Sequence, residues 1–64
     1  MEFEFKFDIG DKVKDIKQGF VFIITGRKRV YKVKDNRMVN VYDGYINDKI
    51  RVDQWREEYL LCIR

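Results

Sequence analysis

The residues that could carry out chemistry in this chain are few. The 64-residue sequence contains no His and no Ser, and its one cysteine is Cys62. A Ser-His-Asp or Cys-His arrangement therefore cannot be assembled. A zinc site built from His and Cys ligands is excluded for the same reason. We expect a protein that is not an enzyme and that needs no metal and no cofactor.

Carboxylates and glycines do not change this expectation. Acidic residues occur in pairs as Glu57-Glu58 and as Asp48 with Asp53. Such exposed acids usually solvate a turn, so we do not assign them to general acid-base catalysis. The glycines stand alone and form no glycine-rich phosphate loop; they are Gly10, Gly19, Gly26 and Gly44. Binding is the class of function that remains.

The charge of the chain is concentrated in its middle third. Residues 1–11 hold one basic and four acidic residues (−3), residues 12–37 hold nine and two (+7), and residues 38–64 hold four and five (−1). A basic block of this kind suits a polyanion or an acidic partner. The competing interpretation is that these lysines and arginines solvate the outer faces and guard the edges of strands.

One candidate binding surface is a basic hairpin with its tip at residues 26–29. Lys and Arg neutralise phosphates and release counterions, so this surface predicts nucleic-acid binding through the phosphate backbone rather than through bases. We expect Tyr31 and Val33 to face inward and Lys32 and Lys34 outward, which leaves no aromatic ring on this face. The candidate residues are Arg27, Lys28, Arg29, Lys32, Lys34 and Arg37.

A second candidate surface is aromatic, and it gives the leading hypothesis of a protein partner, for example a host protein. It would form around an Asp43-Gly44 turn and a later turn, because Tyr, Trp and Arg dominate protein interfaces. Its residues are Tyr42, Tyr45, Arg51, Trp55, Arg56 and Tyr59. The competing interpretation is that Trp55 plugs one end of the core. A third hypothesis is self-association through an N-terminal strand containing Phe3, Phe5 and Phe7.

Composition predicts the fold that must position these surfaces. The chain has no Ala and no Pro and only two Leu, but it has seven Val, seven Ile and ten aromatic residues. β-Branched and aromatic side chains favour strands. We expect one domain over residues 1–64, an all-β SH3-like barrel of five or six short strands. An OB-type barrel fits less well because it usually needs more residues and a longer helix.

Alternation and turn residues place the elements of this barrel. Residues 1–9 form either an N-terminal strand or an extended arm, since apolar and charged residues alternate there. Residues 53–58 should form a helical turn followed by a closing strand at 59–63; a single helix to the C-terminus is the alternative. Between them, strands are expected at 12–16, 20–25, 30–34, 38–42 and 49–52, with turns at 18–19, 26–29, 35–37, 43–44 (type I′) and 47–48.

The cysteine and the N-terminus bear on the compartment. Cys62 lies in the apolar run Leu60-Leu61-Cys62-Ile63, where a buried thiol behaves as a small hydrophobe. A lone thiol fits a reducing cytoplasm. The N-terminus lacks the pattern of a signal peptide, and no apolar run approaches the length of a membrane span. A soluble cytoplasmic protein is expected.

Part of the sequence resembles a family of small uncharacterised phage and prophage proteins. The resemblance is carried by Phe7-Asp8-Ile9-Gly10-Asp11-Lys12-Val13-Lys14-Asp15, by Gly19-Phe20 and Ile23-Ile24-Thr25-Gly26-Arg27, and by Tyr31-Lys32-Val33. Those proteins begin F-x-x-G-D-x-V-x-D, continue G-F-x-G-x-I-T-x-R and reach Y-x-V. The resemblance implies an SH3-like or KOW-type barrel, an origin in a phage or mobile element, and binding to host proteins or nucleic acid.

Overall fold

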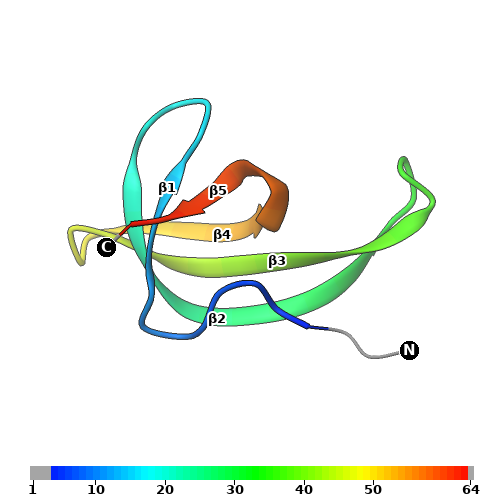
Figure 1. Ribbon diagram of the computed structural model, residues 1–64, viewed down its shortest axis with the longest axis horizontal. Helices are drawn as coiled ribbons and strands as arrows, with labels where there is room; N and C mark the ends of the chain where they lie inside the picture. Colours follow the sequence, from blue (N-terminus) through cyan, green and yellow to red (C-terminus); the bar gives the residue numbers. More distant parts are fainter. Residues whose placement is uncertain (1–3, 64) are drawn as a thin grey trace.

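Residues 4–63, which the computed structural model describes, form one antiparallel sheet of five strands. The strand order is β4-β3-β2-β1-β5, so β1 joins the last strand to the meander of the other three (Figure 1). One 3-10 turn, η1 (Glu57–Tyr59), precedes β5. This is the predicted all-β, SH3-like arrangement with its single helical turn. The strands are β1 (Lys12–Asp15), β2 (Val21–Lys32), β3 (Arg37–Ile46), β4 (Ile50–Arg56) and β5 (Leu60–Cys62).

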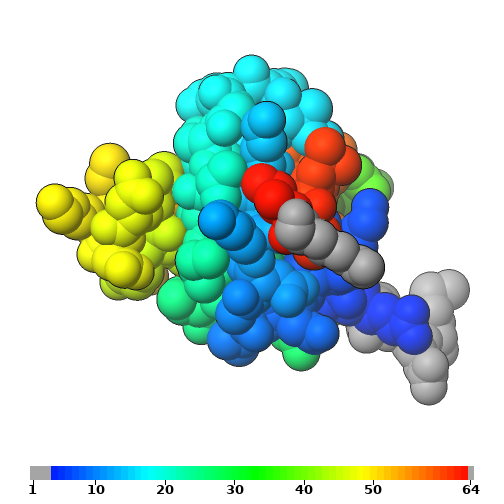
Figure 2. All heavy atoms as spheres, turned by 60° about the vertical axis from the view of Figure 1, so that its left-hand side comes forward, coloured from blue at the N-terminus to red at the C-terminus, as the bar shows by residue number. Residues whose placement is uncertain are grey.

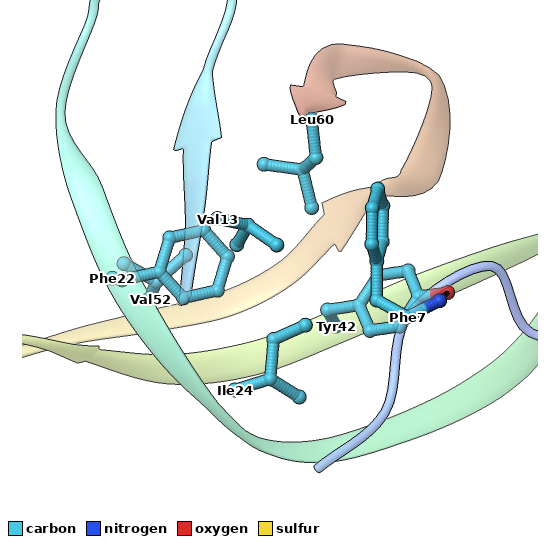
Figure 3. Packing of buried hydrophobic residues seen from close by; sticks show 7 residues of the cluster. All are labelled: Phe7, Val13, Phe22, Ile24, Tyr42, Val52 and Leu60. Atoms are coloured by element: carbon cyan, nitrogen blue, oxygen red, sulfur yellow. Dashed lines mark hydrogen bonds between the residues drawn. The ribbon is translucent and has the colours of Figure 1, made fainter. Parts of the chain in front are cut away.

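Every strand contributes to one hydrophobic core, and the segment before β1 closes it (Figure 3). β2 supplies two side chains, Phe22 and Ile24, each 1% exposed. The other strands supply one each, and Phe7 comes from the N-terminal arm; these residues are Phe7, Val13, Tyr42, Val52 and Leu60. Burying a side chain of this size contributes about 1.5–3 kcal/mol. A chain this short therefore depends on each of them.

β2 is long because it serves two parts of the barrel. Its first residues pair with β1, and the rest of its length pairs with β3. The register shifts between Ile24 and Gly26 of β2, and again between Tyr42 and Gly44 where β3 pairs with β4. Bulges increase the local twist of a strand. The two irregularities lie side by side and bend the sheet around the core.

The predicted type I′ turn at Asp43-Gly44 is wrong, because both residues lie inside β3. Gly44 is buried, and a Cβ placed on it would lie 2.1 Å from the carbonyl oxygen of Ile23 and 2.6 Å from a ring carbon of Phe22. A glycine within a strand often marks such a close backbone approach. The positive φ angles of a type I′ turn occur instead at Asn47 (52°) and Asp48 (60°), residues that tolerate this conformation.

The predicted hairpin tip at residues 26–29 is also wrong. Lys28 lies within β2 and pairs with Val41, and the chain turns only after Lys32. Gly26 belongs to the irregularity after Ile24, so it marks a bend rather than a turn. The hairpin of β2 and β3 is therefore much longer than predicted, and its far end extends beyond the core (Figure 1).

The N-terminal segment lacks the predicted strand, whereas the C-terminal segment has it. Residues 4–11 contain no strand and form an arm that bends at residues 6–7 and turns at residues 9–10, while Phe3 of the predicted strand lies outside the described residues. The closing strand is confirmed, and β4 continues to Arg56, so the helical turn is shorter than predicted. Cys62 is exposed rather than buried. Among the described residues, none of the helical segments has the length and apolar character needed to cross a membrane.

The close approach at Gly44 predicts a specific loss of stability. Gly44→Ala should lower the free energy of unfolding by at least about 1–3 kcal/mol, because overpacking at a site walled by backbone cannot be relieved by a rotamer change. Gly26→Ala is the matched control, since its Cβ would meet only ordinary contacts, the nearest being 3.5 Å from an Asp43 carboxylate oxygen. Urea unfolding followed by Trp55 fluorescence measures both. Equal stability of the two variants would contradict this account of Gly44.

Candidate functional site

The far end of the β2–β3 hairpin is the most strongly charged part of the molecule. Its turn lies at residues 33–36, and the cross-strand pairs before it include Arg29 with Asn40, Tyr31 with Met38, and Lys32 with Arg37. Residues 27–37 hold six basic residues and one acidic residue, a net charge of +5. In Figure 1 this end projects to the right, and the β3–β4 turn projects on the opposite side, where Figure 2 also shows it standing out.

Two arginines of the predicted basic surface are engaged with the rest of the fold. Arg27 donates hydrogen bonds to the carbonyl oxygen of Phe7 and the carboxylate of Asp8, both at 2.8 Å, and its guanidinium lies 4.8 Å from the Phe5 ring centroid. Arg37 meets the carboxylate of Glu58 at 3.4 Å. Arg27 therefore fastens the N-terminal arm, and Arg37 links the hairpin to η1.

The lysines of the hairpin are placed differently. Among residues 4–63, no acidic side chain forms an ion pair with Lys28, Lys32 or Lys34. The one acid of the hairpin, Asp35, is neutralised from outside by Arg56 at 2.6 Å. The positive charge of the three lysines is thus not offset within the hairpin.

Tyr31 is exposed, contrary to the prediction that it faces the core. Its relative exposure is 53%, and that of Val33 is 82%. Arg27 and Tyr42 are cross-strand neighbours and therefore share a face of the sheet. Tyr31 is four residues after Arg27 in β2, so alternation places it on that same face. The hairpin has by then passed the end of the core, and a side chain on that face meets solvent. An aromatic ring is therefore exposed on the hairpin, on the face of β2 opposite Lys28 and Lys32.

A partly buried polar cluster lies where the hairpin meets η1. One carboxylate oxygen of Glu57 accepts hydrogen bonds from the Tyr42 hydroxyl at 2.5 Å, the Asn40 amide at 3.1 Å and the backbone N–H of Lys6 at 2.9 Å. The Tyr42 oxygen in turn accepts from the Phe7 N–H at 3.2 Å. The cluster joins β3, η1 and the N-terminal arm.

The ionisation states within this cluster follow from its hydrogen bonds. Burial raises the pKa of the Glu57 carboxyl, but its hydrogen bonds and the positive charge of Lys6 outweigh burial, so the net pKa lies below the ordinary value for glutamate. Burial is also the largest cause raising the pKa of the Tyr42 hydroxyl, followed by its hydrogen bond to Glu57. At neutral pH the pair is a carboxylate accepting from a neutral phenol.

A cleft of about 170 Å³ lies between the hairpin and η1. Its walls carry hydrogen-bond donors from Arg29 and Asn40 and the carboxylates of Glu57 and Glu58, with Met38 as an apolar member. Arg29 donates to the side-chain oxygen of Asn40 at 3.1 Å. The cleft therefore offers donors and acceptors side by side, next to the exposed pair of Tyr31 and Met38.

The structure does not gather the six predicted aromatic-surface residues into one surface. Tyr42 is 0% exposed and belongs to the core, whereas Tyr45 is 38% exposed. Tyr59 is half-buried, with the ammonium of Lys17 4.7 Å from its ring centroid. The two arginines of the set are in ion pairs, Arg51 with Asp53 and Arg56 with Asp35 and Glu58.

Trp55 packs against the hydrophobic core. It is half-buried, its indole N–H donates to the carboxylate of Asp15 at 2.9 Å, and its ring meets Phe20 edge-on at 5.4 Å. Asp15 is only 1% exposed and also accepts from the N–H of Gln18. Nothing local in the sequence marks Asp15 as the partner of a tryptophan 40 residues away.

Other ligand chemistry has little support in the described part of the chain. Within residues 4–63, no three acidic or thiol side chains are grouped so that they could hold a metal ion.

Comparison with protein-family models, with curated proteins and with solved structures found no match. The resemblance to phage proteins therefore stays a prediction, and the candidate function must be argued from geometry.

The Glu57 cluster predicts a pH-dependent contribution to stability. Because the folded-state pKa of Glu57 is lowered, its contribution is present above the ordinary glutamate pKa and is lost as the pH falls through the folded value. Glu57→Gln should therefore cost about 1–3 kcal/mol at pH 7, as expected for hydrogen bonds to a charged group. The gap to the wild type should shrink towards pH 3. Urea unfolding at several pH values measures it.

Glu58→Gln is the control for this prediction. Glu58 is exposed, and its two ion pairs, with Arg37 and Arg56, are both 3.4 Å long. Exposed pairs contribute roughly 0–1 kcal/mol, so this variant should differ little from the wild type at either pH. A Glu57→Gln gap that stays constant from pH 7 to pH 3 would show that shape, and not charge, matters at this position.

Proposed function

We propose that the protein is a non-enzymatic module that binds nucleic acid through the far end of its β2–β3 hairpin. The observation that carries this proposal is that Lys28, Lys32 and Lys34 have no acidic partner among residues 4–63, while Asp35 beside them is neutralised by Arg56. Lysines without an acidic partner can bind phosphates with release of counterions. Such contacts give affinity without reading the base sequence.

The arrangement of charge along the hairpin supports an extended ligand. Alternation places Lys28 and Lys32 on one face of β2 and Arg29 on the other, and Lys34 lies in the turn. Positive charge therefore runs around the projecting end rather than forming a flat patch. A flexible chain of phosphates could follow it on more than one side.

The protein-partner hypothesis has less support from the geometry. It requires Tyr42, Tyr45 and Trp55 to be exposed together, and Tyr42 is in the core. The indole of Trp55 is also committed to Asp15. We therefore base the proposed function on the hairpin and treat an acidic protein as the competing ligand in the test.

The proposal is tested by fluorescence anisotropy with labelled single-stranded and double-stranded oligonucleotides at 50 and 200 mM salt. Affinity should fall steeply with salt. The triple variant Lys28→Gln/Lys32→Gln/Lys34→Gln should bind more weakly. It should also reduce the slope of log K against log salt by about 2–3, because each phosphate that a lysine no longer neutralises lowers the slope by about 0.7–0.9.

A triple variant elsewhere controls for net charge. Lys12→Gln/Lys14→Gln/Lys49→Gln removes three exposed lysines from β1 and the β3–β4 turn, away from the hairpin end. It should retain most of the affinity. An equal loss in both triple variants, or no binding at 50 mM salt, would overturn the proposal. Displacement of the oligonucleotide by polyglutamate at equal charge concentration would indicate an acidic protein as the ligand.

A further inference from the structure

Tyr31 and Met38 form an exposed apolar pair at the projecting end of the hairpin. They are cross-strand partners, and their relative exposures are 53% and 44%. The Tyr31 hydroxyl donates to the side-chain oxygen of Asn36 in the turn, which restricts the ring. An exposed tyrosine ring on a basic hairpin is the kind of platform on which single-stranded nucleic acids stack their bases.

The cleft beside this pair has the size and polarity to receive one base. A cavity of about 150 Å³ accommodates a benzene ring, and this cleft measures about 170 Å³. Met38 belongs both to the cleft and to the exposed pair. A base edge carries donors and acceptors together, and the cleft offers both, from Arg29 and from Glu57.

The charges around the cleft would orient such a ligand. Glu57 and Glu58 lie in its wall, and a phosphate next to them would be repelled. Lys34 lies outside it in the turn, and Lys28 and Lys32 lie on the opposite face of β2, where phosphates are favoured. A nucleotide strand that passes over the turn would therefore place its backbone on the lysines and an uncharged base toward the cleft.

We infer that the hairpin selects single-stranded over double-stranded nucleic acid by stacking one unpaired base on Tyr31 and Met38 beside the cleft. This inference rests on the proposed function and names the ligand class for the same site. In a duplex the base faces are already stacked on their neighbours, so only an unpaired base presents a face to the tyrosine.

The test compares a labelled 12-nucleotide single strand with the corresponding duplex at 50 mM salt. The wild type should bind the single strand more tightly. Tyr31→Ala should weaken single-strand binding by roughly 5- to 150-fold, the effect of removing one base–aromatic stack, and leave duplex binding nearly unchanged. Tyr31→Phe keeps the ring and should retain most of the affinity. Tyr45→Ala removes another exposed tyrosine, outside the hairpin end, and should have no effect.

The outcomes separate the two proposals. If the wild type binds both ligands equally, Tyr31→Ala changes neither, and the lysine triple variant is still impaired, stacking is overturned while phosphate binding by the hairpin stands. If neither ligand binds, both are overturned. Tyr31 and Met38 lie outside the core cluster, so the variants should keep the fold. Circular dichroism of each variant verifies this.

Discussion

The fold depends on the close approach of two backbones at Gly44. The carbonyl of Ile23 and the ring of Phe22 occupy the space where any other residue would place its Cβ. This close approach lets β2 and β3 stay paired while the sheet bends around a core to which all five strands contribute. The register shifts on either side supply the additional twist. The contact is steric rather than attractive, and it acts by allowing the rest of the packing.

The same bend determines the shape of the candidate site. β2 and β3 remain paired from Ile23 to Lys32, which is longer than the part of the sheet that covers the core. The part of the two strands beyond the core forms a projecting hairpin. Tyr42 and Tyr31 lie on the same face of the sheet, but Tyr42 is in the core and Tyr31 is exposed to solvent. Exposure of Tyr31 is thus a consequence of strand length, not of a change in the side to which the ring points.

Arginines and lysines have separate roles around this hairpin. Arg27 holds the arm and Arg56 neutralises Asp35, because a planar guanidinium can serve several acceptors in fixed geometry. The partly buried hydrogen-bond cluster at Glu57 fixes β3, η1 and the arm to one another. Lysines, which are more strongly hydrated, are left for the solvent side. Asp8, Asp35 and Glu58 pair with arginines, and the charge that supports the proposed function belongs to lysine.

The sequence by itself determined the all-β class, the strands around Val13 and Val39, and the turn at Asn47-Asp48, and it left a helix as the alternative to the closing strand. Each determined feature follows from local alternation or turn chemistry that needs no distant partner. Only the tertiary structure decided that Asp43-Gly44 and residues 26–29 are strand, that Asp15 and Glu57 are hydrogen-bonded inside the fold, and that Tyr42 is buried while Tyr31 is not. The physical reason is that a glycine signals either a turn or a close contact, and a tyrosine either a core or a surface. Which one holds depends on residues from other strands that local sequence does not specify.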